Sequence, residues 1–168
     1  GIVGPWAHKY PHFASPEPRI GFLQEATRWW DHWLKGLNTD VLSKARYAIY
    51  LMNGVRPKTK YDKRVGRWID GSDLDKKNKE QLWYFGSNQK LESASKPHQE
   101  IDVLLSSPQD CGMDSGEFCS IWLGADMPGD QRSDDAKSEC FTSNQTTCPT
   151  NIIGSPKVKL TLQSDKPR

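Results

Sequence analysis

Three tryptophans fall within five consecutive positions of the segment from Ile20 to Leu37, and this segment constrains the fold more than any other. Its apolar residues recur at helical spacing in two adjoining stripes, namely Leu23, Ala26, Trp30, Trp33 and Leu37, and Phe22, Ala26, Trp29 and Trp33. Gly36 suits a left-handed cap at the C-terminal end of this predicted helix. An apolar arc of this width normally docks on a large sheet, yet the remaining sequence has no parallel α/β pattern that would supply one.

The residues before the predicted helix indicate the end of a strand that runs into a stiff loop. The strand is apolar and stops at Pro5, because a proline cannot donate to a sheet ladder. Four prolines between residues 5 and 18 leave no room for a helix there. His8 lies in this loop, directly after the strand and before the helix. A sequence that opens inside an apolar strand predicts that the chain belongs to a longer one.

Short strands are predicted from about residue 46 onward. Arg46–Met52 is β-prone and apolar on both faces, as a buried strand would be, and Asn53-Gly54 predicts a turn after it. Further candidates are Gln81–Phe85, Glu100–Leu105 and Lys157–Gln163, the last with Val158, Leu160 and Leu162 alternating inward. Turn residues separate these runs, which is typical of sandwiches and barrels. Four or five strands are too few to close a sandwich, so we expect an incomplete one.

Charge and composition exclude several classes of partner. The 23 basic and 21 acidic residues nearly cancel, so neither a nucleic-acid nor a membrane-surface partner is expected. No run of about 18 apolar residues predicts a membrane span, and residues 1–10 lack the features of a signal peptide. The compartment stays open, with a cytoplasmic location slightly favoured. No cofactor is expected.

The four cysteines form two C-x7-C pairs, Cys111 with Cys119 and Cys140 with Cys148. Neither pair has the C-x2-C spacing or the nearby histidine of a zinc site, so no metal site is predicted. Free thiols and disulfides both remain open.

Two charged stretches are interpreted as structural. The basic stretch from Arg56 to Arg67 also contains Asp62 and is followed by more aspartates, so it is interpreted as a solvated segment between domains rather than a nucleic-acid site. Asp130, Asp134 and Asp135 do not match a calcium loop, and we expect them to serve turns and caps.

A catalytic serine on a strand-to-helix elbow requires the pattern G-x-S-x-G. The nearest approach is the segment 112–116, GMDSG, which has the wrong spacing and no apolar strand before it. The sequence therefore predicts no nucleophile elbow. His8 is the histidine of interest, because the order Ser, acid, His places the base after the last strand of an α/β-hydrolase. His12 is a weaker candidate, since it lies farther from the strand end.

Two neighbouring segments, GPWAHKYPHF at residues 4–13 and IGFLQEATRWWDHWLKG at residues 20–36, combine a histidine loop with a tryptophan-rich helix. Shorter pieces follow at Gly66-Arg67-Trp68, at 117–124, at 128–136 and at 153–162. Together these resemble the X-Pro dipeptidyl-peptidase and cocaine esterase family of serine hydrolases. In that family a GPW-x-H loop carries the catalytic histidine, so the resemblance implies that His8 is the general base.

The resemblance implies two parts. Residues 1–40 are expected to be the C-terminal remnant of an α/β-hydrolase domain, comprising strand, histidine loop and helix. Residues 41–168 are expected to be the first part of a mostly β, antiparallel jelly-roll domain of galactose-binding-like type, incomplete in this chain.

The implied parent activity is hydrolysis of an ester or amide bond, X-Pro dipeptide bonds among them, through an acyl-serine intermediate. A small-molecule ester or peptide would be the substrate, an upstream hydrolase domain is the expected partner, and a homo-oligomer remains open. We expect the chain to be inactive alone, because the serine and the acid are absent from it. Two alternatives stay open: a non-catalytic jelly-roll module that binds carbohydrate or protein, and a truncated product without function.

Overall fold

Helix α1 spans Phe22–Lys35 and confirms the predicted tryptophan-rich helix. Gly36 ends it in the left-handed conformation, with a φ of 69°. The N–H of Gly36 donates to the His32 carbonyl and that of Leu37 to the Asp31 carbonyl, both at 3.1 Å. This pair of bonds is a Schellman cap, in which glycine is favoured because it has no Cβ to strain the backbone.

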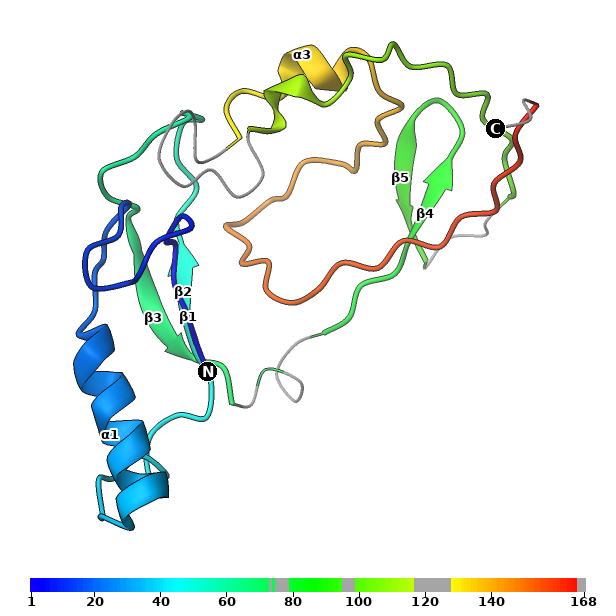
Figure 1. The fold of residues 1–168 in the computed structure, drawn as a ribbon. Helices are drawn as coiled ribbons and strands as arrows, with labels where there is room; N and C mark the ends of the chain where they lie inside the picture. Colours follow the sequence, from blue (N-terminus) through cyan, green and yellow to red (C-terminus); the bar gives the residue numbers. More distant parts are fainter. Residues whose placement is uncertain (73, 75–78, 95–98, 117–127, 166–168) are drawn as a thin grey trace.

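The computed structural model describes residues 1–72, 74, 79–94, 99–116 and 128–165 (Figure 1). Its further elements are β1 (Ile2–Val3), β2 (Ala48–Met52), β3 (Gly66–Asp70), β4 (Trp83–Gly86), β5 (Lys90–Ser93), the 3₁₀ helix η1 (Met113–Ser115) and α3 (Arg132–Asp135). After residue 43, the described regular structure is mostly strand in antiparallel pairs, with few helical residues.

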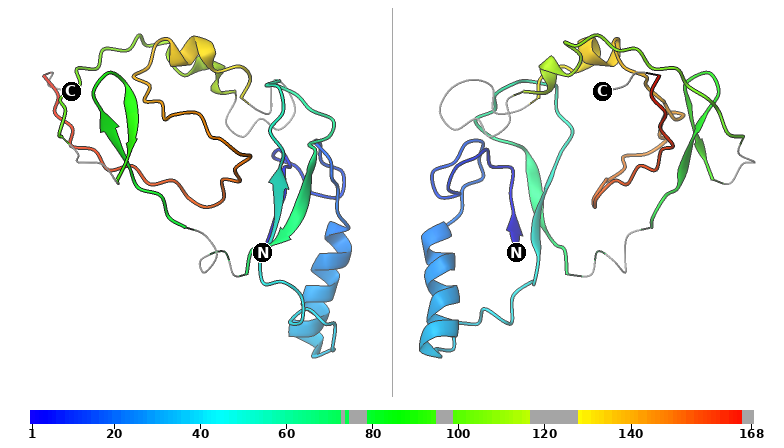
Figure 2. Two further views of the ribbon diagram at one scale, coloured as in Figure 1. Left: turned by 180° about the vertical axis from the view of Figure 1, so that it is seen from behind. Right: turned by 45° about the vertical axis from the view of Figure 1, so that its right-hand side comes forward.

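A three-stranded sheet in the order β1-β2-β3 lies at the same end of the molecule as α1 (Figures 1 and 2). β1 pairs with β2 in parallel, with Ile2 opposite Ala48. β2 pairs with β3 in antiparallel fashion, with Tyr50 opposite Trp68. The first residues of the chain are thereby joined to the region that begins near residue 43. β1 and β2 confirm two predicted strands.

The link between β2 and β3 differs from the prediction. The tight turn expected at Asn53-Gly54 is wrong, because neither residue has the positive φ of a type I′ turn. The Asn53 N–H instead donates to the Val65 carbonyl at 2.8 Å, which continues the ladder, and the chain returns through the loop 53–65. The end of the basic stretch forms the start of β3, and most of the stretch is exposed, as expected of a solvated segment.

A second, two-stranded sheet consists of the hairpin β4-β5, of which only β4 was predicted. Asn88 and Gln89 at its tip have φ values of 55° and 57°, and the Lys90 N–H donates to the Ser87 carbonyl at 3.3 Å. Positive φ values of this kind match the right-handed twist of hairpin strands. Within the described residues, no strand of this hairpin contacts the β1-β2-β3 sheet, so no sandwich is closed here.

Two predicted strands are absent. Residues 100–105 and 157–163 have no strand assignment. The predicted inward residues of the second segment are exposed, Leu162 at 79 %. An alternating sequence forms a stable strand only when a neighbour takes its ladder hydrogen bonds and covers its apolar face. None of the described strands pairs with either segment.

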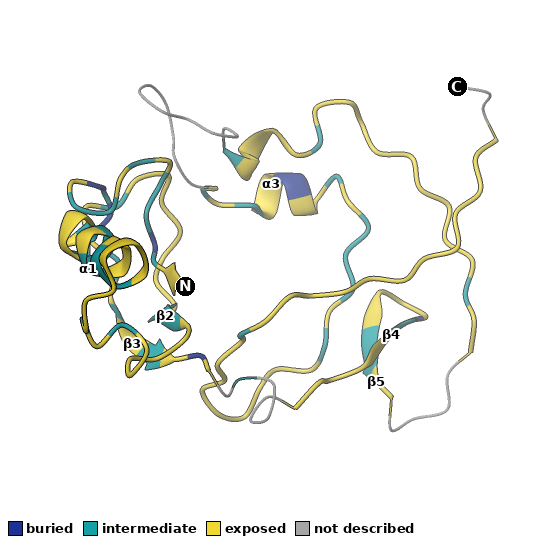
Figure 3. Cartoon of the chain, turned by 60° about the horizontal axis from the view of Figure 1, so that its bottom comes forward, coloured by how far each residue is buried: buried dark blue, intermediate teal, exposed yellow. Residues whose placement is uncertain are grey.

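Buried positions are few among the described residues (Figure 3), and they are Pro5, Ala14, Pro16, Gly71, Gly86 and Asp134. The apolar face of α1 is open, with Trp30 and Trp33 each 54 % exposed. The expected docking of this helix on a large sheet is therefore not made within the described residues. Burial of these tryptophan rings would stabilise the fold, but the described residues leave about half of each ring exposed.

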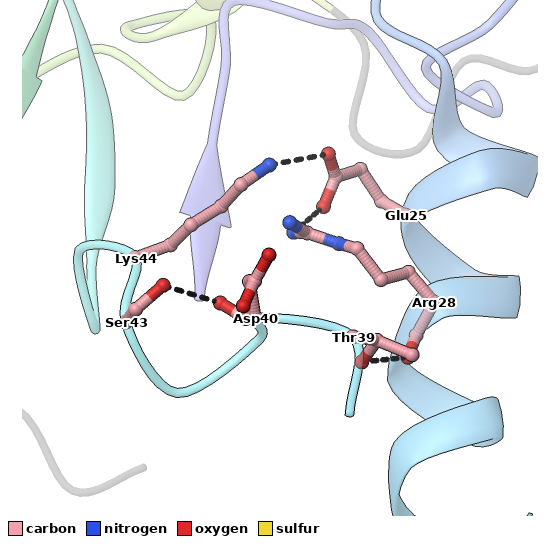
Figure 4. Close-up of polar contacts among 6 residues, drawn as sticks. All are labelled: Glu25, Arg28, Thr39, Asp40, Ser43 and Lys44. Carbon is pink, nitrogen blue, oxygen red and sulfur yellow. Dashed lines mark hydrogen bonds and ion pairs between the residues drawn. The ribbon is translucent and has the colours of Figure 1, made fainter. Parts of the chain in front are cut away.

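Polar contacts tie α1 to the segment that follows it (Figure 4). Glu25 forms ion pairs with Arg28, one turn along the helix, and with Lys44 at 3.5 Å. The Thr39 hydroxyl donates to the Arg28 carbonyl at 2.9 Å. These contacts hold the segment 39–44 against the side of α1 that carries Glu25 and Arg28. In the part of the chain that the structure describes, no helix is long and apolar enough to cross a membrane.

Candidate functional site

The candidate site is the proline-rich loop between β1 and α1, which we call the histidine loop (residues 4–20). The loop folds back on itself, because the Trp6 indole N–H donates to the Pro18 carbonyl at 2.7 Å. The Ile20 N–H donates to the Pro11 carbonyl at 3.2 Å. Its prolines restrict φ, so few alternative loop conformations compete with this one.

The segment 61–64 fastens the histidine loop from outside. The Glu17 N–H donates to the Asp62 carbonyl at 2.7 Å, and the Arg64 N–H donates to the Glu17 carbonyl at 2.9 Å. The Ser15 hydroxyl donates to the Tyr61 carbonyl at 3.1 Å. These bonds satisfy backbone groups that a loop would otherwise leave to water.

A pair of indole rings adds an apolar contact to these bonds. Trp6 of the histidine loop lies beside Trp68 of β3, with ring centroids 6.1 Å apart. Sequence reasoning missed the whole arrangement. The one signal for it in the sequence was the β-prone pair Trp68-Ile69 at the end of the basic stretch.

His8 lies at a bend of this loop and is exposed. No other described residue forms a hydrogen bond or ion pair with its imidazole. A catalytic base needs a nucleophile and an orienting acid within hydrogen-bond reach, and the described residues place neither beside His8. The position of His8 after a strand and before a helix is as predicted, and its catalytic role stays a prediction.

His12 is held differently from His8. Its ring stacks on Phe22 at 6.0 Å and 8° and meets Phe13 edge to face at 4.6 Å. Its Nδ1 atom is shielded from solvent without a hydrogen-bond partner in the described structure. His12 thus packs in the aromatic cluster at the start of α1, which agrees with its weaker candidacy. His98 lies outside the described residues.

The segment 112–116, the nearest approach to a nucleophile elbow, has a different structure from an elbow. It contains η1, and the Ser115 hydroxyl donates to the Gly112 carbonyl at 2.6 Å. An elbow holds its serine exposed between a strand and a helix, whereas here the hydroxyl is spent on the turn itself. The segment 112–116 is therefore a 3₁₀ turn and not a strand-to-helix elbow.

Two aspartates around η1 and α3 accept backbone hydrogen bonds, although neither helix has a side-chain hydrogen bond from its own N-cap residue. The buried Asp134 accepts from the Asp114 N–H at 2.8 Å, and Asp130 accepts from the Arg132 N–H at 3.1 Å. The Arg132 guanidinium also lowers the pKa of the Asp130 carboxyl through side-chain hydrogen bonds. Within the described residues, no three His, Cys, Asp or Glu side chains gather as metal ligands would.

An ion pair links the turn before η1 to the turn after α3. Lys137 donates to Asp110 at 2.8 Å. The hydrogen bond and then the charge of Lys137 lower the pKa of the Asp110 carboxyl, and the hydrogen bond from Lys137 to Asp110 is the main cause that raises the pKa of the Lys137 ammonium. Both groups are near solvent, so the pair is screened by salt.

Comparison with known protein families assigns residues 43–168 to a family. These residues match the model of the family described as the X-Pro dipeptidyl-peptidase C-terminal non-catalytic domain. No curated protein and no solved structure matches the chain significantly. The match covers most of the chain and confirms the family resemblance seen in the sequence. Residues 117–124, one of the segments that carry this resemblance, lie outside the described structure. The chain therefore belongs to the family of X-Pro dipeptidyl-peptidase C-terminal non-catalytic domains.

Proposed function

We propose that residues 1–40 are the C-terminal end of an α/β-hydrolase domain, and that His8 is the catalytic histidine of a serine hydrolase. The observation that carries the proposal is the exposed His8 on a loop that directly follows β1 and is fastened by the family domain at residues 61–64. A base must stay accessible to substrate on a backbone that is held in place, and His8 is exposed on a loop that the segment 61–64 fastens.

The free edge of β1 supports this role. β1 pairs with β2 on one side, and no other described strand pairs with it. The parallel pairing is typical of sheets whose faces are covered by helices. The hydrolase domain, with its sheet, is proposed to add at this edge and to cover the exposed tryptophan face of α1.

In the proposed reaction, the His8 imidazole accepts the proton of a serine hydroxyl as that oxygen attacks the carbonyl carbon of an ester or amide. It then returns the proton to the leaving group, which departs and leaves an acyl-serine. Water repeats the sequence and releases the acid. The serine, its acidic partner and the oxyanion donors are assigned to the hydrolase domain outside this chain. Small esters and X-Pro peptides are the proposed substrates.

A second candidate concerns residues 41–168 taken alone. The family description of residues 43–168 as a non-catalytic domain favours a module that binds carbohydrate or protein. It requires that this part fold and bind without residues 1–40. The two candidates differ in whether the longer protein has a reactive serine.

A fluorophosphonate probe, which labels only activated serines, tests the proposal. It is applied to this chain and to the reading frame extended upstream. Labelling of the extended protein, with the present chain unlabelled and the His8→Ala variant of the extended protein strongly reduced, is the expected result. A folded extended protein that takes up no probe would contradict the hydrolase and favour the binding module.

A further inference from the structure

Two cysteines from different sequence pairs lie near the C-terminal end of α3. Cys111 precedes η1, and its Sγ lies 3.1 Å from the Ser138 Oγ and 3.9 Å from the Asp134 carbonyl oxygen. Cys140 follows α3, and its Sγ lies 3.5 Å from the Asp135 carbonyl oxygen. The spacing in the sequence would instead pair each with a cysteine eight positions later.

The two acceptor carbonyls belong to consecutive residues of α3, and both point toward its C-terminal end, about 100° apart around the helix axis. The two sulfurs that contact them therefore share one small region at the C-terminal end of α3. Both residues are partly shielded from solvent, and both thiols are free. Each lies in a short connection beside a helix end rather than in a strand, and closure requires the two Cα atoms to come within about 7 Å of each other.

We propose that Cys111 and Cys140 form a redox-responsive pair that closes to a disulfide across η1 and α3. The oxidant is a low-molecular-weight disulfide such as oxidised glutathione. One protein thiolate attacks it, a mixed disulfide forms and one small thiol leaves. The second protein thiolate then attacks the mixed disulfide at the protein sulfur, the protein S–S bond forms and the second small thiol leaves. Two protein thiols are oxidised and one small disulfide is reduced to two thiols. This inference is independent of the proposed hydrolase role.

The surroundings of Cys140 set the pH dependence of closure. Loss of solvent around its sulfur, and then the charges of Asp135 and Glu139, raise the pKa of the Cys140 thiol. The thiolate is the attacking species, so closure should be slow at neutral pH and should accelerate as the pH rises.

The closed pair would join the turn before η1 to the end of α3, and it would reinforce the Lys137–Asp110 ion pair between the same two turns. Cys148 is exposed. Among the described residues, no contact joins Cys148 to Cys111 or to Cys140. It is therefore the matched control cysteine. Cys119 lies outside the described residues.

Disulfide mapping of the full chain tests the pair. Reduced protein is equilibrated with oxidised and reduced glutathione, free thiols are alkylated in acid, and the non-reduced digest is analysed by mass spectrometry. The same reaction is run in guanidinium chloride, where loop length governs pairing and the seven-residue loops should predominate. The expected result is a peptide linking Cys111 to Cys140 that predominates in buffer and falls at least fivefold in denaturant.

Variants separate the fold from chance pairing. Cys148→Ser should leave the yield of the Cys111–Cys140 peptide unchanged, whereas Cys111→Ser and Cys140→Ser should each leave the other thiol as a glutathione adduct. Equal ratios of disulfides in buffer and in denaturant would overturn the proposal. So would a native pattern dominated by Cys111–Cys119 and Cys140–Cys148.

Discussion

Trp6 and Trp68 lie with their ring centroids 6.1 Å apart and their planes inclined by 45°, which joins the histidine loop to strand β3. The contact spans the two parts of the chain that the sequence predicted as separate domains. It is accompanied by the exchange of backbone hydrogen bonds between Glu17 and the segment 62–64. The histidine loop is therefore joined to the segment 61–68, which lies within the region that matches the family.

Replacing Trp68 by alanine should loosen the histidine loop. The loss of a half-exposed indole and of its ring contact should cost about 1–2 kcal/mol, less than a fully buried tryptophan. Hydrogen exchange of the Glu17 and Arg64 amides should accelerate at least tenfold, because these amides bond across the same junction. Trp83→Ala in β4 is the matched control, since the exposed fractions are 38 % for Trp68 and 39 % for Trp83. Equal exchange in the two variants would contradict this role of Trp68.

Replacing Gly36 by alanine should shorten or destabilise α1. Its φ of 69° is unfavourable for a residue with a Cβ, and the cost should be about 1 kcal/mol. A Cβ would meet no atom within 4 Å at Gly36 or at Gly54, so steric contact does not distinguish the two sites. Gly54→Ala, at a residue without positive φ, is the control and should be nearly neutral. Urea unfolding followed by helical circular dichroism measures both. The prediction fails if Gly54→Ala is as costly as Gly36→Ala.

The Lys137–Asp110 pair should contribute stability over a defined pH range. Lys137 lowers the pKa of folded Asp110 below 3.8, so this contribution is complete above that pH and disappears as the pH falls through the lowered value. Lys137→Met should therefore reduce the free energy of unfolding slightly at pH 6, and this reduction should disappear once the pH lies well below the lowered pKa of Asp110. Salt at 0.5 M should shrink the difference, since the pair is exposed.

A control variant separates this pair from general charge effects. Lys58→Met removes one positive charge from the loop 53–65, and the ion pair of Asp110 is made by Lys137 rather than by Lys58. It should leave the acid limb of the stability curve unchanged. A pH-independent effect of Lys137→Met would show that packing rather than the ion pair is responsible.

The exposed tryptophan face of α1 predicts that the same substitutions affect this chain and the protein extended upstream differently. Trp30→Gln together with Trp33→Gln should change the stability of the present chain by no more than about 1 kcal/mol, since both rings are half-exposed. The same pair of changes should cost several times more in the protein extended upstream, where the proposed hydrolase domain would cover them. Guanidinium unfolding of both lengths measures the difference, and an equal small effect in both would contradict the proposed covering.

Local signals made part of this fold predictable. Helix α1 has apolar periodicity and a glycine cap, and β2 is a continuous apolar run, so each carries its own evidence. β3 was missed because its arginine and flanking glycine resemble a polar loop until Tyr50 and the rest of β2 pair with it. Lys157–Gln163 failed for the opposite reason, since its clean alternation finds no partner among the described strands.

The sequence predicted where His8 lies along the chain, but it did not predict the hydrogen bonds that fasten its loop. A histidine between a strand and a helix can be found from residue order alone. The bonds from segment 61–64 are mostly backbone bonds between residues more than forty positions apart, so side-chain patterns carry no signal for them. Cys111 and Cys140 both lie near the C-terminal end of α3 although they are far apart in the sequence. The C-x7-C spacing pairs each of them with a different cysteine.

Ester hydrolysis by the upstream-extended protein tests the central claim most directly, with His8 compared against His12 of the same loop. With p-nitrophenyl acetate, His8→Ala should lower kcat by roughly 10⁴-fold or more, as loss of a triad histidine does. His12→Phe keeps the aromatic packing with Phe13 and Phe22 and should leave kcat within about twofold. A folded His8→Ala variant that retains full activity, or a His12→Phe variant that loses it, would contradict the assignment of His8 as the catalytic base.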